Sequence, residues 1–410
     1  MAFYERRLDK VNITTFSEKK RTENIIDFLD LINTEKARRF HKSFPMYKET
    51  PLVSLLQLAK TMGVKKFYVK DESYRFGLNA FKVLGGSFAI GNYIAKKLGM
   101  DITELPYSKI ISDEIRQKTG EITFVTATDG NHGRGVAWTA KQLKQKSVVY
   151  MPKGSSEERL ANIRAEGADA CITNMNYDDA VRFANKKAGE HQWVMVQDTS
   201  WTGYEDIPRW IVQGYGTMAL EAYESLPEKP THIFIQAGVG AFAGAVTGFF
   251  ANVYKEDKPV IIIVEPDQAD CIFQTAKAAD GKLHFVGGEM NTIMAGLACG
   301  EPCGIGWNVL ESYADFAVSC SDETAAKGMR VLGAPLPDDI QIISGESGAA
   351  GAGAAVEILT KPENEDIRTK LGLNEESVIL CFSTEGATDK ERYKAIVWDG
   401  KFPSDQEGRA

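Results

Sequence analysis

The chain has 410 residues, and its 48 lysines and arginines against 56 aspartates and glutamates give a formal net charge of −8. Hydrophobic residues make up 43% and charged residues 25%, a balance typical of globular proteins and not of disordered chains. A net negative charge without a basic block argues against nucleic acid as a partner. At roughly 100–200 residues per domain, the length predicts two domains, or a large domain that carries a smaller one.

Neither a membrane span nor secretion is expected. Residues 231–254 contain no charged side chain, but four glycines interrupt the segment, namely Gly238, Gly240, Gly244 and Gly248. A spanning helix needs about 20 mainly apolar residues, so this segment predicts a strand, a glycine loop and a buried helix instead. Met1–Arg7 lacks the apolar core of a secretory signal, which favours a cytoplasmic protein.

The six cysteines are scattered along the chain, as is usual for a protein of a reducing compartment. Cys299 and Cys303 have a loose metal-ligand spacing, but no second pair of Cys or His accompanies them. We therefore expect no metal site. The sequence leaves open whether Cys271 approaches Cys299 or Cys303.

The first elements in chain order are short. A helix is expected around residues 25–36, and an extended segment at Glu49–Leu52, because a residue before proline avoids the helical conformation. Phe67–Val69 predicts a strand. A loop over residues 77–85 then leads into a helix that continues through Ile94.

From residue 122 onward, short apolar runs alternate with helical segments. The expected elements are strand Ile122–Val125, helix Asn131–Gln145, strand Ser147–Met151, helix Glu157–Glu166, strand Ala168–Ile172, helix Tyr177–Glu190, strand Trp193–Val196, and, after a loop over Asp198–Pro208, strands Ile233–Ile235, Val260–Val264 and Val378–Phe382. This alternation is typical of parallel sheets, and all-apolar strands suit burial on both faces. The sequence predicts an α/β fold of two parallel-sheet domains, a large one of residues 1–85 and 205–410 and a smaller inserted one of residues 86–204.

Four loops near the ends of predicted strands carry the residues of chemical interest, because open α/β sheets bind ligands there. The first loop is Asn79–Lys82, whose lysine stands at the start of a helix beside apolar residues. The helix dipole and burial would both favour the neutral, nucleophilic amine of Lys82. The alternative is an ordinary solvated helix lysine.

The second loop covers residues 126–133. Gly130 and Gly133 allow the backbone to come close to a ligand, and the Asn131 amide can both donate and accept hydrogen bonds. The alternative is a helix start that Asp129 or Asn131 caps.

The third and fourth loops follow two apolar strands. Gly238–Gly244 offers a row of backbone N–H groups at the start of a helix, which suits a phosphate group. The same glycines also suit a nicotinamide dinucleotide, with Glu265 as the acid for its ribose. Phe382–Gly386 places the hydroxyl groups of Ser383 and Thr384 just past the last strand.

Taken in order, these motifs resemble the fold-type-II pyridoxal phosphate enzymes, the family of tryptophan synthase β and threonine dehydratase. Phe81 and Lys82 match the family's S-F-K motif, with Ala80 in the serine place. Three further stretches resemble its S-x-G-N-H element, its T-x-A-x-G-[IL]-A stretch and its E-x-S-G-A helix start, namely Thr128–His132, Thr292–Ala298 and Gly345–Ala349. Gly238–Ala241 resembles its tetraglycine loop.

The resemblance implies pyridoxal 5'-phosphate as the cofactor, an active site in the cleft between the two domains, and a homodimer. It implies a Schiff base at Lys82 and a hydrogen bond from Asn131 to the ring hydroxyl of the cofactor. It places the phosphate at a cradle of four residues, Gly238, Val239, Gly240 and Ala241. Ser383, or in second place Thr384, is expected at the pyridine nitrogen.

Departures from the dehydratases indicate a member that releases ammonia from 2,3-diaminopropionate. Asp129 stands where dehydratases carry a small uncharged residue, and Val196–Tyr204 is similar to the corresponding run of such members. A carboxylate can bind the second ammonium of this substrate and partly exclude serine, because a buried carboxylate without its cation is costly. The implied reaction is α,β-elimination from the D and L isomers to pyruvate and two molecules of ammonia.

The resemblance also implies how Lys82 and the two aspartates divide the proton transfers and substrate binding of this reaction. Lys82 and Asp129 would act as bases on opposite faces of the substrate, and Asp198 would bind or protonate the β-amine. The two aspartates could exchange these roles, and Asp198 could instead cap a loop.

The sequence leaves three alternatives to the elimination of ammonia from 2,3-diaminopropionate. A threonine or serine dehydratase would use the same cofactor with hydroxide as the leaving group. A dinucleotide-dependent oxidoreductase would use the Gly238–Gly240 turn and would leave Lys82 and Asn131 without a task. A ligand-sensing relative would bind an amino acid without releasing ammonia.

Overall fold

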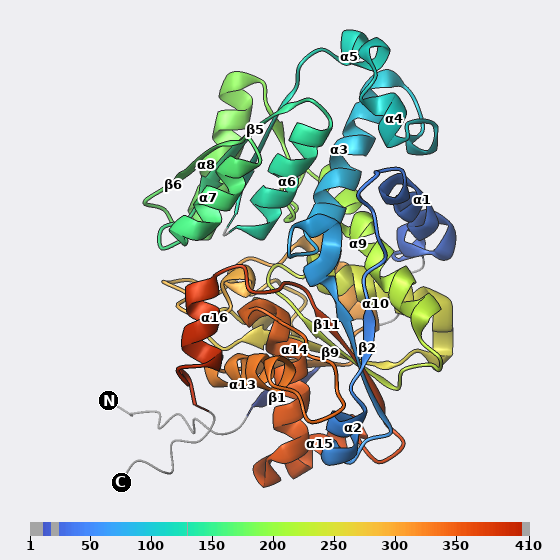
Figure 1. Cartoon of the computed structure of the whole chain (residues 1–410), viewed down its shortest axis with the longest axis vertical. Coiled ribbons are helices and arrows are strands. Elements are labelled where there is room, and N and C mark those ends of the chain that lie inside the picture. The colour runs from blue at the N-terminus through green and yellow to red at the C-terminus, as the bar shows by residue number, and fades with distance from the viewer. Residues whose placement is uncertain (1–10, 18–23, 129, 404–410) are drawn as a thin grey trace.

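The computed structural model describes residues 11–17, 24–128 and 130–403. In this part of the chain two β-sheets, surrounded by helices, form separate units of the molecule (Figure 1). The N-terminal segment Met1–Arg7 and the candidate base Asp129 lie outside the described residues.

The larger sheet has seven strands in the order β1-β10-β9-β8-β11-β3-β2. They are β1 (Asn12–Thr15), β2 (Leu52–Ser54), β3 (Lys66–Asp71), β8 (His232–Gln236), β9 (Val260–Pro266), β10 (Phe316–Cys320) and β11 (Val378–Ser383). The inner five are parallel, as predicted, whereas β1 and β2 pair antiparallel at the two edges. From β2 the chain reaches β3 through α2 (Leu56–Met62) alone, a connection too short for the crossover of a parallel pair.

Helices cover both faces of this sheet, which explains its all-apolar strands. Ile233 and Ile235 of β8 pack in the core with α9 (Asp206–Ser225) and α10 (Ala241–Tyr254). Phe234 faces the other way, into the core with α13 (Asp322–Gly333) and α14 (Glu346–Thr360). The two pairs of helices lie on opposite sides of the strands in Figure 1. Further α-helices outside the smaller sheet unit are α1 (Leu31–Lys42), α3 (Val83–Leu98), α4 (Tyr107–Ile110), α5 (Asp113–Thr119), α11 (Cys271–Ala278), α12 (Gly304–Tyr313), α15 (Glu365–Leu371) and α16 (Lys390–Val397).

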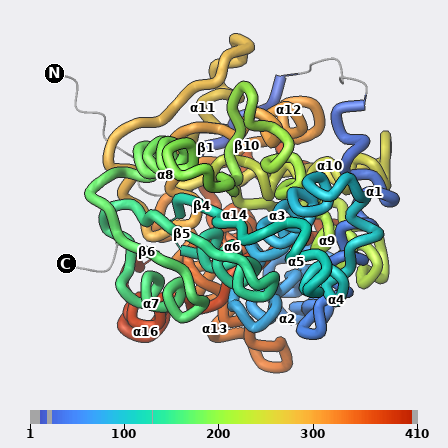
Figure 2. Tube along the Cα trace, turned by 90° about the horizontal axis from the view of Figure 1, so that it is seen from above, coloured from blue at the N-terminus to red at the C-terminus, as the bar shows by residue number. Residues whose placement is uncertain are grey.

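The smaller sheet has four parallel strands in the order β6-β5-β4-β7. Its elements are β4 (Thr123–Ala127), α6 (Asn131–Gln142), β5 (Lys146–Met151), α7 (Glu157–Ala165), β6 (Asp169–Ile172), α8 (Tyr177–His191) and β7 (Val194–Met195). Every strand and helix predicted between residues 122 and 196 is confirmed to within a few residues. Seen from above, these green elements form a group of their own (Figure 2).

Two predicted boundaries, one of a helix and one between the domains, can be compared with helices of the structure. The helix expected around residues 25–36 begins at Leu31 instead, because the Asp30 side chain accepts a hydrogen bond from the N–H of Asn33 and caps it. The predicted boundary between residues 85 and 86 falls inside α3, so the domain limits stay a prediction.

Residues 231–254 form the predicted strand, glycine loop and buried helix, as β8 and α10. Among the helices of the described residues, none has the length and apolar character that a membrane span requires.

Candidate active site

The carboxyl ends of β8, β11 and β4 meet at one pocket, and the four predicted loops contribute to it. Its lining includes Lys82 and Asn131 together with Gly238–Ala241 and Thr384. These residues come from segments more than 300 positions apart in the sequence. The sheets place them together because parallel strands end at a common edge, where α/β proteins bind ligands.

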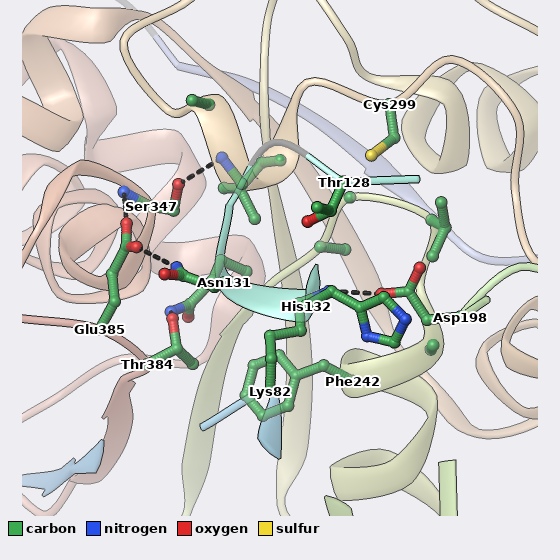
Figure 3. Close-up of a pocket in the computed structure, with 18 of the residues that line it drawn as sticks. Lys82, Thr128, Asn131, His132, Asp198, Phe242, Cys299, Ser347, Thr384 and Glu385 are labelled. Carbon is green, nitrogen blue, oxygen red and sulfur yellow. Dashed lines mark hydrogen bonds and ion pairs between the residues drawn. The ribbon is translucent and has the colours of Figure 1, made fainter. Parts of the chain in front are cut away.

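Lys82 is the N-cap of α3, and its side chain reaches into the pocket (Figure 3). Two backbone hydrogen bonds hold the preceding loop to the segment after β11: the N–H of Phe81 donates to the carbonyl of Thr384 at 3.1 Å, and the N–H of Gly386 donates to that of Asn79 at 3.0 Å. The Lys82 side chain is 18% exposed. The alternative of a solvated helix lysine is therefore wrong.

Asp198 is the acidic partner of Lys82. The Lys82 Nζ donates to the Asp198 Oδ2 at 2.5 Å, and the Tyr177 hydroxyl donates to the Oδ1 at 3.3 Å. Asp198 is 2% exposed, and burial alone would raise its pKa. The Lys82 charge and the hydrogen bond that Lys82 donates outweigh burial and hold the pKa of Asp198 well below its usual range. The pocket thus contains an ionised, buried carboxylate beside the lysine amine.

Asn131 binds a residue that the sequence analysis did not single out. Its Nδ2 donates to the Oε2 of Glu385, while the backbone N–H of Ser347 donates to the Oε1 at 3.2 Å. Figure 3 shows Glu385 between these two partners. Asn131 opens α6 and Ser347 lies in α14, so Glu385 connects the two sheet units at the pocket.

The glycine loop presents free donors. Within the part of the chain that is described, the backbone N–H groups of Gly238, Val239 and Gly240 donate to no protein acceptor. Gly240 adopts a φ of +90°, a conformation that favours glycine, and precedes Ala241, the first residue of α10. Unpaired N–H groups at a helix start form a site for an anion such as phosphate.

His132 and Gln236 both line the pocket, and each has a buried polar atom without a hydrogen-bond partner. The His132 ring is 3% exposed, and its Nε2 donates to the carbonyl of Val196 at 2.8 Å, which leaves the Nδ1 as an acceptor without a partner. Burial lowers the pKa of His132, so this ring is neutral near neutral pH. The Oε1 of Gln236 is likewise buried and without a partner. The Gln236 Oε1 lies against α14, because a Cβ on Gly351 would be 3.1 Å from it. A polar ligand in the pocket would satisfy the Nδ1 of His132.

The two hydroxyls expected near the ring nitrogen differ in position. Thr384 lines the pocket, and its Oγ1 accepts a hydrogen bond from the Nε2 of Gln236 at 2.9 Å. Ser383 is not among the lining residues, and its Oγ donates to that of Ser344 at 2.9 Å. The geometry favours Thr384 over Ser383 for the contact.

Glu265 does not face the pocket. Its carboxyl group accepts the backbone N–H groups of Ile272 and Phe273, at 3.0 and 2.6 Å, where α11 begins. The role of ribose acid in an oxidoreductase is therefore wrong. Cys271, Cys299 and Cys303 are all free thiols, and Cys299 lines the pocket. No cluster of three or more metal-binding side chains occurs in residues 11–17, 24–128 and 130–403.

Comparisons with known proteins agree with this geometry. The family model "Pyridoxal-phosphate dependent enzyme" matches residues 44–372. Diaminopropionate ammonia-lyase of Salmonella typhimurium is 52% identical to this chain, over 88% of the chain and 91% of that protein. Crystal structures of diaminopropionate ammonia-lyase from Escherichia coli, in complex with D-serine and with an aminoacrylate–PLP azomethine reaction intermediate, are 45% identical with TM-scores of 0.90 and 0.87, and each comparison covers 97% of this chain and 99% of the other.

The fold, the lysine at a helix start and the glycine loop define a pyridoxal-phosphate-dependent enzyme of fold type II, and the cofactor is pyridoxal phosphate. At about half identity over nine-tenths of its length, the chain belongs to the diaminopropionate ammonia-lyase family.

Proposed function

We propose that this chain removes ammonia from 2,3-diaminopropionate by α,β-elimination, giving pyruvate and two molecules of ammonia. The observation that carries the proposal is the ionised, buried Asp198 beside Lys82, in a chain of the diaminopropionate ammonia-lyase family. The substrate has a second ammonium where serine has a neutral hydroxyl. A buried carboxylate binds that charge strongly, and it disfavours serine because it would be left without a cation.

The residues of the pocket fit the cofactor. The N–H groups of Gly238, Val239 and Gly240 are available to its phosphate, and the Nδ1 of His132 in the pocket lining has no hydrogen-bond partner. Asn131 would contact the ring hydroxyl, and Thr384 the ring nitrogen. When bound, pyridoxal phosphate supplies an electron sink for the negative charge that forms at the α-carbon.

The side chains of the chain supply positioning and proton transfer. Lys82 would hold the cofactor covalently through its Nζ, and once the substrate α-amine has replaced it, the free amine would accept the α-proton on one face of the substrate. Asp198 binds the β-ammonium once Lys82 is engaged elsewhere, and this group leaves with the electron pair of the C–N bond as neutral ammonia, so the step needs no further proton. Asp129 would serve as the base on the opposite face, which would let one site accept both D and L isomers.

The first test is the product ratio. The holoenzyme is supplied with D- and L-2,3-diaminopropionate, and ammonia and pyruvate are measured separately. We expect ammonia and pyruvate in a ratio of two to one from each isomer, and a higher kcat/KM for diaminopropionate than for serine. A one-to-one ratio, or a preference for serine, would contradict the proposal and favour a dehydratase.

The second test concerns Lys82. The variant Lys82→Ala removes the only amine proposed to form the covalent bond with the cofactor. We expect it to lose the visible chromophore that borohydride traps on the wild-type protein, with the glycine loop still able to bind phosphate. A chromophore that survives in this variant would contradict the assignment of Lys82.

We further propose that the protein is a cytoplasmic homodimer, which is the arrangement that its family resemblance implies. Six free thiols, five of them buried, are consistent with a reducing compartment. Light scattering coupled to gel filtration should give a mass about twice that of one 45.2 kDa chain. A mass equal to that of a single chain would contradict the dimer.

A further inference from the structure

A second cavity, of about 450 Å³, adjoins the active-site pocket. It lies between α8, the segment Thr199–Trp201, and residues 283–304, which contain the exposed Phe285. Tyr177 and Val239 line both spaces. The two cavities therefore share a wall, and this wall contains a residue of the glycine loop.

Tyr177 connects the second cavity to the reacting groups. Its hydroxyl donates to the Oδ1 of Asp198 at 3.3 Å and accepts from the Nε2 of Gln197 at 2.8 Å. The hydroxyl thus belongs to the active-site pocket, while the side chain as a whole also borders the second cavity. A molecule in the second cavity is one side chain away from Asp198.

The next residue, Asp178, has a carboxylate that lines this cavity and makes no hydrogen bond or ion pair with any described residue. The charged groups around it are Asp179 and Arg182, also on α8, and Glu301 on the opposite wall. Arg182 is already engaged, with Glu301 at 2.9 Å and Asp179 at 2.8 Å. Burial in the first place, and then Glu301, raise the pKa of Asp178 to about 6, so the carboxylate is ionised but poorly solvated near neutral pH.

We propose that this cavity is the chamber through which the substrate reaches Lys82, and that Asp178 attracts the second ammonium of the substrate there. The inference rests on the proposed function and adds a specificity-determining residue outside the reacting groups. A half-buried carboxylate without a partner favours a cation, and a charge near the path of a ligand speeds its association. Serine has no net positive charge and would gain nothing from Asp178.

Another explanation of Asp178 is local to its helix. Asp178 and Asp179 both lie in the first turn of α8, where an acidic side chain favours the helix dipole. Asp179 shares this position and this charge, but it is exposed and does not line the cavity. Asp179→Asn is therefore the matched control for Asp178→Asn.

The experiment measures association and not turnover. Holoenzyme is mixed with 2,3-diaminopropionate or serine in a stopped-flow instrument near neutral pH, and the absorbance of the cofactor reports binding. We expect Asp178→Asn to slow the association of diaminopropionate by about two- to fivefold at low salt, and Asp178→Lys to slow it further. Serine should associate with these variants at the wild-type rate. Asp179→Asn should bind both amino acids at wild-type rates. Added salt should reduce the difference between wild type and Asp178→Asn.

Three results would overturn the inference. In the first, diaminopropionate associates with Asp178→Asn at the wild-type rate. In the second, Asp178→Asn slows the association of serine as much as that of diaminopropionate. In the third, Asp179→Asn slows the association of diaminopropionate as much as Asp178→Asn does. The proposed function has a separate outcome, because ammonia release by the wild type tests it directly. If the wild type releases ammonia but Asp178→Asn binds diaminopropionate at the wild-type rate, the proposed role of the second cavity is wrong and the proposed function stands.

Discussion

At Asp198, burial and charge act in opposite directions on one carboxyl group. Burial would favour the protonated acid, but the Lys82 ammonium within hydrogen-bond distance holds the group ionised. The same pairing keeps Lys82 oriented toward the pocket. Each charge therefore stabilises the other in a position where burial alone would favour the neutral group.

This pairing predicts the effect of Asp198→Asn, which keeps the shape of the side chain and removes its charge. We expect kcat/KM for 2,3-diaminopropionate to fall by about 10²- to 10⁴-fold, the usual contribution of a group that transfers a proton. Ammonia release measures the loss. The control is Tyr177→Phe, which removes the hydroxyl that donates to Asp198 at 3.3 Å and accepts from Gln197 at 2.8 Å but leaves the carboxylate in place, and it should cost much less. A variant Asp198→Asn with wild-type kcat/KM would show that the aspartate is only structural.

The sequence located part of this site and could not locate the rest. Lys82 and Asn131 lie in motifs at helix starts, and the structure brings both to the pocket. Glu385 lies in the fourth predicted loop, Phe382–Gly386, but the sequence drew attention only to its hydroxyl groups, and the contact with Asn131 identifies the glutamate. Between Ser383 and Thr384, the choice depends on which side chain faces the pocket, a property of local backbone geometry that composition does not encode.

At the scale of elements, the smaller sheet was predictable and several helices of the larger unit were not. Strands and helices alternate cleanly between residues 122 and 196, so periodicity identifies them. The start of α14 is indicated only by the resemblance of Gly345–Ala349 to a family motif, because the helix is rich in glycine and alanine and buried along almost its whole length. A helix that is buried all round lacks the polar face from which amphipathic patterns identify helices.

Glycines also set how closely α12 approaches the glycine loop. A Cβ on Gly306 would lie 2.6 Å from the carbonyl oxygen of Gly240, and one on Gly244 would lie 2.9 Å from the Cα of Gly306. These distances are shorter than van der Waals contact, so the backbones of α10 and α12 meet directly. The position of the phosphate cradle thus depends on a helix that contributes no donor to it.

Gly306→Ala should therefore weaken cofactor binding. The added methyl group would push α12 away from Gly240 and shift the N–H groups of the loop, at a cost of about 1–3 kcal/mol, as is usual for overpacking. We expect the Kd of pyridoxal phosphate, measured by absorbance titration, to rise by about tenfold or more. Gly304→Ala is the control, because its Cβ would meet only the Oγ of Ser200, at 3.5 Å. Equal affinities in the two variants would contradict this account.

At the scale of the whole molecule, the interior holds charges as well as apolar groups. Lys70, Glu72, Arg75 and Glu221 are fully buried or nearly so, and they form a network between β3, the segment after it, and α9. Glu221 accepts hydrogen bonds from both Lys70 and Arg75, at 2.8 and 2.7 Å. Such a network satisfies every charge only when the helix and the sheet are docked, and it therefore fixes their relative position.

His41 lies beside this network and joins three helices. Its Nε2 donates to the carbonyl of Leu84 in α3 at 3.0 Å, and its Nδ1 accepts from the Thr217 hydroxyl of α9 at 2.8 Å, while the residue itself belongs to α1. Burial, and then the charge of Arg75, lower the pKa of His41 to about 3. The fold therefore requires the neutral ring.

This requirement predicts how pH affects the free energy of unfolding. Below its unfolded-state pKa near 6.5, His41 binds a proton only in the unfolded chain, so its contribution to stability is complete above that pH and falls as pH drops toward 3. Other buried groups oppose this trend: the pKa of Glu346 is raised to about 7, so its protonation stabilises the fold as pH falls. The informative quantity is therefore the difference in the free energy of unfolding between wild type and His41→Gln, measured by denaturant unfolding at each pH. We expect that difference to shrink by about 2 kcal/mol between about pH 8 and pH 5. A constant difference would mean that His41 can carry a proton inside the fold.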